Sequence, residues 1–94
     1  MKDKQRAVAL EYDSSLTAPL VVAKGEGVLA KRLEQVAREH GIPVVRESEL
    51  AGRLFVIDTG TFIPEPFYKA VAEVLAFVWR SSDRLRDSPN RKKG

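Results

Sequence analysis

The 94-residue sequence contains no cysteine, and histidine occurs only once. Without cysteine the chain cannot form disulfide bonds or metal sites with thiolate ligands. The single imidazole, His40, has no accompanying feature that would place it in a Ser-His-acid set, so nucleophilic catalysis of that kind is not indicated. We therefore expect His40, at the end of a helical pattern, to be structural or solvated, and we expect neither a metal site nor a cofactor.

Long apolar runs are missing as well. No stretch approaches the roughly 18–20 apolar residues that a helix needs to span a bilayer. The first six residues are polar, and the apolar run at 7–10 is too short for the central region of a signal peptide. Apolar residues make up 44% and charged residues 31% of the chain, as in ordinary globular domains. The sequence favours one small cytoplasmic domain.

The net charge of +3 is unevenly distributed. Residues 80–94 contain six basic and two acidic side chains, which leaves residues 1–79 with a net charge of about −1. A general basic surface for nucleic acids is therefore not indicated. We expect residues 82–94 to form a disordered basic tail. This tail leaves one alternative function open, a nucleic-acid or anion-binding module whose affinity would fall steeply with salt.

The clearest local pattern is a buried strand that turns directly into a helix. The strand is predicted over 19–24, where two β-branched valines lie in an apolar run too short for a helix. The helix is predicted over 26–40. Gly25 and Gly27 suit the sharp bend between them. A strand that leads into a helix in this way is half of a β-α-β unit, and we expect a neighbouring strand at 7–12.

The same two glycines permit a second interpretation, a phosphate-binding loop. The segment lacks the third glycine of a dinucleotide fingerprint and the Gly-Lys-Ser/Thr of a P-loop. A nucleotide-dependent enzyme at Gly25–Gly27 is therefore the weaker alternative, and a tight strand-to-helix turn is the favoured one. In the helix that follows, an apolar stripe predicts the face that packs on the domain; it comprises Leu29, Leu33, Val36, Ala37 and His40.

The second half of the chain predicts one more strand and two more helices. Pro43 favours extended backbone, so a short strand is expected at 43–46. A short helix is expected at about 48–56, although residues 54–57 alone would also suit a strand. The last helix is predicted over 64–81 and has two adjacent apolar stripes, of which one is available for a partner. The stripes are Phe67, Val71, Val74 and Val78, and Tyr68, Ala72, Leu75 and Trp79.

Together these patterns predict an α/β domain over residues 7–81, between a polar lead at 1–6 and the basic tail. Its predicted elements are a sheet of about three strands (7–12, 19–24 and 43–46) and helices that cover it (26–40, about 48–56 and 64–81).

Four blocks of sequence, at 7–13, 18–25, 41–45 and 63–78, occur in an order and spacing that resemble a known family. They are similar to the cytoplasmic C-terminal domain of the FlhB/YscU family, the substrate-specificity switch of flagellar and related type III protein export. The resemblance covers about residues 7–80. It implies a small sheet covered by helices and a docking role rather than catalysis.

The resemblance also implies a site and partners. In the family, export substrates are thought to dock on a hydrophobic patch, and the matching positions here are Ala18, Pro19, Ala72 and Leu75. The expected partners are export substrates and other export-apparatus proteins, with no nucleic acid and no membrane span. The expected location is cytoplasmic, or peripheral to the membrane export gate.

Two departures from the family qualify these expectations. Members carry Asn-Pro-Thr-His before the first block and cleave themselves between Asn and Pro, whereas Lys2-Asp3-Lys4-Gln5 stand in those places here. Self-cleavage is therefore not expected, and no enzyme activity is predicted. The printed sequence does not include the membrane-spanning half of the family, and we expect the chain to correspond to the cleaved fragment made as a separate protein.

The missing half has a structural consequence. In the family, a strand from the preceding residues lies beside the first strand of this chain. Without it, strand 7–12, whose Val8, Leu10 and Tyr12 share one face, is expected to be an exposed edge with unpaired backbone groups. We hypothesise that this edge is filled by a strand from a full-length FlhB or by self-association.

Overall fold

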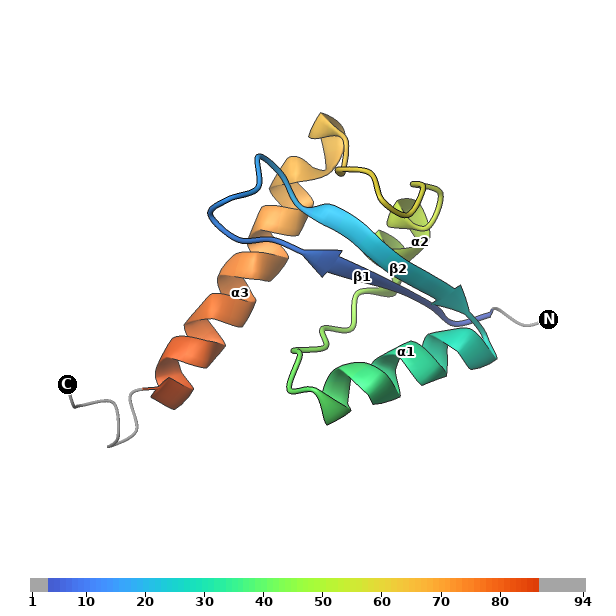
Figure 1. Cartoon of the computed structure of the whole chain (residues 1–94), viewed down its shortest axis with the longest axis horizontal. Coiled ribbons are helices and arrows are strands. Elements are labelled where there is room, and N and C mark those ends of the chain that lie inside the picture. Colours follow the sequence, from blue (N-terminus) through green and yellow to red (C-terminus); the bar gives the residue numbers. More distant parts are fainter. Residues whose placement is uncertain (1–3, 87–94) are drawn as a thin grey trace.

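The structure, a computed structural model, describes residues 4–86, and the side chains of residues 4–81. Two strands cross the middle of the molecule, and α1 runs along one side of them (Figure 1). The C-terminal half of α3 projects away from the strands. The elements in chain order are β1 (Arg6–Glu11), β2 (Leu20–Glu26), α1 (Val28–Glu39), α2 (Ser48–Leu54), the 3-10 helix η1 (Glu65–Phe67) and α3 (Tyr68–Arg86).

Strands β1 and β2 form an antiparallel ribbon that runs from the Arg6–Glu26 pair to the Glu11–Leu20 pair. The register shifts between Ala9 and Leu10, which bends the ribbon as a β-bulge does. The far edge of β2 is covered by residues 60–63. There the Val21 N–H donates to the Thr61 carbonyl at 3.0 Å, and the Ile63 N–H donates to the Pro19 carbonyl at 2.9 Å. The two strands expected at 7–12 and 19–24 are thus confirmed.

The prediction of a strand at 43–46 is wrong. Residues 42–47 have no regular structure, and the described part of the chain forms a sheet of two strands only. The β-α-β expectation fails with it, because β1 and β2 are antiparallel and no strand follows α1 within residues 4–86. The reason is tertiary: a β-branched segment becomes a strand only where a sheet edge offers it hydrogen bonds, and no described edge pairs with this one.

The helices occur where they are expected, with shifted ends. Helix α1 starts after Gly27, whose φ of 63° breaks the strand, and Gly41, with φ of 71°, follows its end. The chain over 48–54 is helical, so the alternative strand at 54–57 is excluded. The last helix begins as the 3-10 turn η1 and continues to Arg86, beyond the expected end at 81. The first five residues of the expected disordered tail, 82–86, are therefore helical, and the prediction is wrong for them. Residues 87–94 lie outside the described residues, so the disorder of that part remains a prediction.

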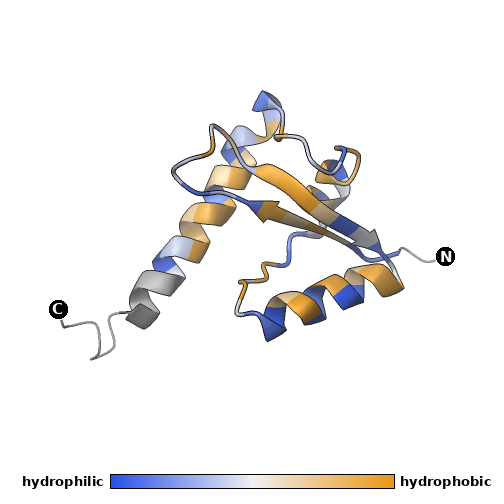
Figure 2. Ribbon diagram, viewed as in Figure 1, coloured by the Kyte–Doolittle hydropathy of each residue, from blue (hydrophilic) through white to orange (hydrophobic). Residues whose placement is uncertain are grey.

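A single apolar core joins the ribbon to α2, α3 and the connection between them. The centre of the ribbon is strongly apolar, and apolar residues alternate with polar ones along the first half of α3 (Figure 2). Five side chains are buried together, and others pack half-buried against them. The buried five are Val21, Leu54, Ile57, Ile63 and Val71, and their half-buried neighbours include Val8, Leu10, Leu50, Phe67 and Leu75.

Helix α1 is rotated relative to the face predicted from its sequence. Ala30 is fully buried, whereas Leu29, Val36 and His40 are exposed. The predicted stripe is therefore wrong for these three residues, although Leu33 and Ala37 are half-buried as expected. The corner before the helix is tight. A Cβ atom on Gly25 would lie 2.8 Å from the backbone carbonyl carbon of Leu29, so the helix approaches β2 closely.

Lys24 ties β2 to the end of α2, a role that its sequence context did not indicate. Its Nζ donates to the Phe55 carbonyl at 2.6 Å and to the Ile57 carbonyl at 2.8 Å. It also lies 5.1 Å from the centre of the Phe55 ring. Helices leave carbonyl groups without partners at their C-terminal end, and a lysine there is favourable. Lys24 therefore ties the residues that follow α2 to the ribbon.

Candidate docking groove

One face of α3 supplies half of the candidate site. Tyr68, Ala72, Leu75 and Trp79 follow one another at intervals of four, three and four residues, so they share a helix face. Leu75 is half-buried against the core, which anchors this face to the domain. Tyr68 and Trp79 each leave about half of their surface exposed, and Ala72 is exposed as well.

The connection between β1 and β2 supplies the other half. It begins with a turn at Asp13, whose Oδ1 accepts hydrogen bonds from the Ser15 N–H at 2.8 Å and from the Ser15 hydroxyl at 2.5 Å. The hydroxyl bond first, and then the backbone bond, lower the pKa of the Asp13 carboxyl, which stays ionised as an acceptor at neutral pH. The last two residues of the connection are Ala18, which is buried, and Pro19, whose carbonyl accepts a hydrogen bond from the Ile63 N–H.

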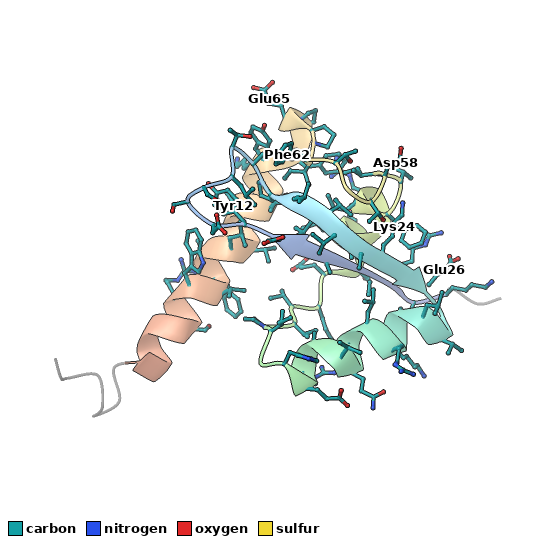
Figure 3. The ribbon with its side chains drawn as sticks, viewed as in Figure 1. Tyr12, Lys24, Glu26, Asp58, Phe62 and Glu65 are labelled. Carbon is teal, nitrogen blue, oxygen red and sulfur yellow. The ribbon has the colours of Figure 1, made fainter. Side chains whose placement is uncertain are left out.

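These two halves enclose an apolar groove with a volume of about 280 Å³. Tyr12 and Trp79 join the halves: their ring centres are 6.4 Å apart and their planes differ by 27°. Tyr12 lies at the end of β1 beside α3 (Figure 3). The groove is lined by Tyr12, Thr17, Ala18, Pro19, Tyr68, Ala72, Leu75 and Trp79.

All four residues of the predicted docking patch, Ala18, Pro19, Ala72 and Leu75, line this one groove. Two further lining residues, Tyr68 and Trp79, belong to the apolar stripe that was noted in the sequence of α3. Thr17 and the ring contact between Tyr12 and Trp79 were not anticipated. Helical and strand periodicities operate within one element, so they carry no signal for a contact between a loop and a helix.

The residues predicted to mark an exposed edge divide between two environments. Val8 and Leu10 are half-buried against the core, so only part of each side chain is exposed. Tyr12 lines the groove instead. The backbone of β1 is an edge, because β2 is the one strand paired with it among residues 4–86. The edge is thus a property of the backbone rather than of these three side chains.

The lining of the groove is uncharged and mainly apolar. Its lining contains no carboxylate, imidazole or ammonium group. Elsewhere in the described part of the chain, no group of three His, Asp or Glu residues is arranged to hold a metal ion. At the Gly25–Gly27 corner, the Gly27 N–H donates to the Gln5 carbonyl at 2.7 Å, which removes it as a phosphate donor. The groove can therefore recognise a ligand by shape and apolar burial.

A second, wider groove of about 680 Å³ lies on another face of α3. Residues 44–47 and α2 border it, and Phe77 is an exposed aromatic ring on its α3 wall. Its lining mixes apolar residues with Arg46, Arg53, Glu47, Glu49 and Glu73. No residue lines both grooves, so substitutions can separate the two surfaces.

The described helices include none that is long and apolar enough to cross a lipid bilayer. Solved structures with the same fold include the PscU C-terminal domain, which is 33% identical with a TM-score of 0.75 over 79% of this chain and 96% of that one. The cytoplasmic domain of FlhB from Shewanella putrefaciens is 39% identical with a TM-score of 0.75, over 80% of this chain and 64% of that domain.

Relatives found by sequence are named FlhB. The flagellar biosynthetic protein FlhB of Aquifex aeolicus is 46% identical over 74 residues, which is 77% of this chain and 21% of the relative. The FlhB of Salmonella typhimurium is 45% identical over 76 residues, 79% of this chain and 20% of the relative. The chain thus spans about one fifth of the length of these proteins. The model of the FlhB HrpN YscU SpaS family matches residues 4–78, and the chain belongs to that family.

Proposed function

We propose that this chain is a protein-interaction domain of a flagellar or related type III export apparatus, and that it docks export substrates in the groove between residues 12–19 and α3. The proposal is supported by residues that are distant in the sequence but adjacent in the structure. Residues from two distant parts of the sequence, Ala18 and Pro19 on one side and Ala72 and Leu75 on the other, line one apolar groove. The family membership supplies the biological setting, and the cytoplasm is the proposed location.

The groove has the features of an interface centre. Its aromatic rings, Tyr12, Tyr68 and Trp79, are partly exposed, so a ligand gains apolar burial by covering them. Large aromatic side chains in partly formed pockets commonly carry much of the binding energy in protein interfaces. Leu75 packs against the core and Ala18 is buried, so this part of the groove is already ordered before a ligand binds. The ligand that fits this groove is an apolar segment of a substrate protein.

Binding without catalysis is the activity we propose. The lining offers no nucleophile paired with a base, and Lys2-Asp3-Lys4-Gln5 stand in place of the self-cleavage motif. Of these four, Lys2 and Asp3 lie outside the described residues, so the absence of self-cleavage remains a prediction from the sequence. The alternative anion-binding function of the tail also remains a prediction, because residues 87–94 are not described.

Ala72→Asp is expected to weaken capture of export substrates by about tenfold or more. Its side chain is exposed in the free protein, so the fold should tolerate the change. A docked ligand would bury the new carboxylate without a partner, and each 1.4 kcal/mol of that cost is a factor of ten in affinity. The measurement is a pull-down of flagellar export substrates by the purified domain, with circular dichroism to check folding.

Phe77→Asp is the matched control, because Phe77 is an exposed apolar residue of α3 that lines the other groove. It should leave capture unchanged. Equal loss in both variants, or no loss in Ala72→Asp, would reject the groove as the docking site. In cells lacking the gene, restored motility and normal hook length with wild type but not with Ala72→Asp would tie the groove to export.

We further propose that the edge of β1 takes up a strand in trans, from a full-length FlhB or from a second copy. Support comes from the ribbon, in which β2 is the one described strand paired with β1. An exposed edge readily pairs with an additional strand. We expect either a dimer in size-exclusion chromatography or capture of an N-terminal FlhB fragment. A monomer that captures no such fragment would contradict this part of the proposal.

A further inference from the structure

The exposed side of α1 carries apolar residues that no described part of the chain covers. Val28 is 82%, Leu29 64% and Val36 38% exposed. Leu29 and Val36 are separated by two helical turns, so they align along the helix, and Val28 lies beside the first of them. We refer to these three residues as the outer apolar row. The neighbouring Ala30 is the fully buried residue of α1.

Positive charges accompany the outer apolar row. Lys31 and Arg32 are exposed in the first half of α1. Neither takes part in the ion pairs formed within residues 4–81, in which the basic partners are Arg6, Arg38 and Arg46. The acidic Glu34 is half-buried on the opposite side, where Arg38 and Arg46 pair with it. The acidic group on the exposed side is Glu39, at the far end of the helix.

We propose that the exposed face of α1 binds the surface of a membrane that contains anionic lipids. A surface helix with apolar residues beside lysine and arginine is the pattern of interfacial helices. The outer apolar row would enter the boundary between headgroups and acyl chains, and Lys31 and Arg32 would pair with the anionic headgroups. The apolar residues are aliphatic, which favours lipid over single-stranded nucleic acid, whose bases stack on aromatic rings.

The placement of α1 allows this contact. The helix forms one border of the molecule, with the ribbon on its other side (Figure 1). It contributes no residue to the docking groove, so the proposal does not depend on the proposed function. The first turn of α1 lies close against Gly25 of β2, so Val28 and Leu29 belong to a well-packed part of the fold.

Sedimentation with lipid vesicles tests the proposal. We expect the full chain to bind vesicles of equal parts phosphatidylcholine and phosphatidylglycerol about tenfold better than vesicles of phosphatidylcholine alone, with binding that falls as salt is raised. Leu29→Asp should reduce binding to the anionic vesicles about tenfold. Val56→Asp is the matched control, because Val56 is 78% exposed but follows α2, and it should bind as wild type does.

A fluorescent label gives a second measurement that does not depend on a loss of binding. The chain has no cysteine, so Leu29→Cys and Val56→Cys each create one labelling site. With anionic vesicles, an environment-sensitive dye at position 29 should shift to the blue, and the same dye at position 56 should not. Equal affinity for neutral and anionic vesicles, unchanged binding of Leu29→Asp, or no shift at position 29 would each overturn the proposal.

Discussion

Ile63→Ala is expected to destabilise the domain by about 2–5 kcal/mol, the range for removing a large aliphatic side chain from a packed core. Ile63 is 2% exposed and is one of the largest fully buried side chains. Its backbone N–H is bonded to Pro19, so the segment has little freedom to collapse into the cavity. Because small domains have a total stability of about 5–15 kcal/mol, this loss is a large fraction of the total.

Urea unfolding followed by circular dichroism measures the change. Ile42→Ala is the matched control: it removes the same atoms from an exposed side chain and should cost less than about 1 kcal/mol. Similar costs for the two variants would mean that Ile63 does not carry the core. Alanine keeps the backbone N–H, so the hydrogen bond to the Pro19 carbonyl should remain in the folded variant, and the loss of stability reports on the side chain alone.

Gly25→Ala is expected to destabilise the domain by about 1–3 kcal/mol, the usual cost of overpacking. Gly25 has no positive φ, so crowding alone determines the result. The new Cβ would lie 2.8 Å from the backbone carbonyl carbon of Leu29 and 2.9 Å from its oxygen. These are backbone atoms, so relief requires that the whole first turn of α1 moves away from β2.

Gly52→Ala is a control in which the change in stability should have the opposite sign. Gly52 lies inside α2, and a Cβ there would meet the Arg6 guanidinium at 3.6 Å, an ordinary contact. Alanine is favoured over glycine inside a helix by about 0.5–1 kcal/mol, so this variant should be more stable than wild type. Thermal unfolding of both variants gives the comparison. A stabilised Gly25→Ala would show that the corner between β2 and α1 is looser than the structure describes.

Local patterns predicted most of the elements. The alternation in 7–12 and the β-branched run in 19–24 correspond to β1 and β2, and three helical patterns correspond to α1, α2 and α3. Such patterns succeed because the signal lies within one element. The segment at 43–46 has an equally strand-like sequence but no pairing edge, and it is irregular. Pairing is decided between elements, so a single segment cannot reveal it.

The docking groove, too, could be predicted only in part from the sequence. The apolar stripe Tyr68, Ala72, Leu75 and Trp79 was visible in the sequence, and the family resemblance added Ala18 and Pro19. That Tyr12 stacks on Trp79 across the groove, and that Lys24 closes the end of α2, depended on how the ribbon packs against the helices.

The sequence by itself determined that this chain is a small α/β domain of the FlhB HrpN YscU SpaS family, since strand and helix periodicity and the four ordered blocks are properties of local sequence. The tertiary structure alone decided which apolar faces are buried. The absence of a side chain at Gly25 allows the close approach of the first turn of α1, and within this helix Ala30 is buried whereas Leu29 and Val36 are exposed. Helical periodicity gives the width of an apolar face, but the contact distance between elements selects the part of that face that is buried.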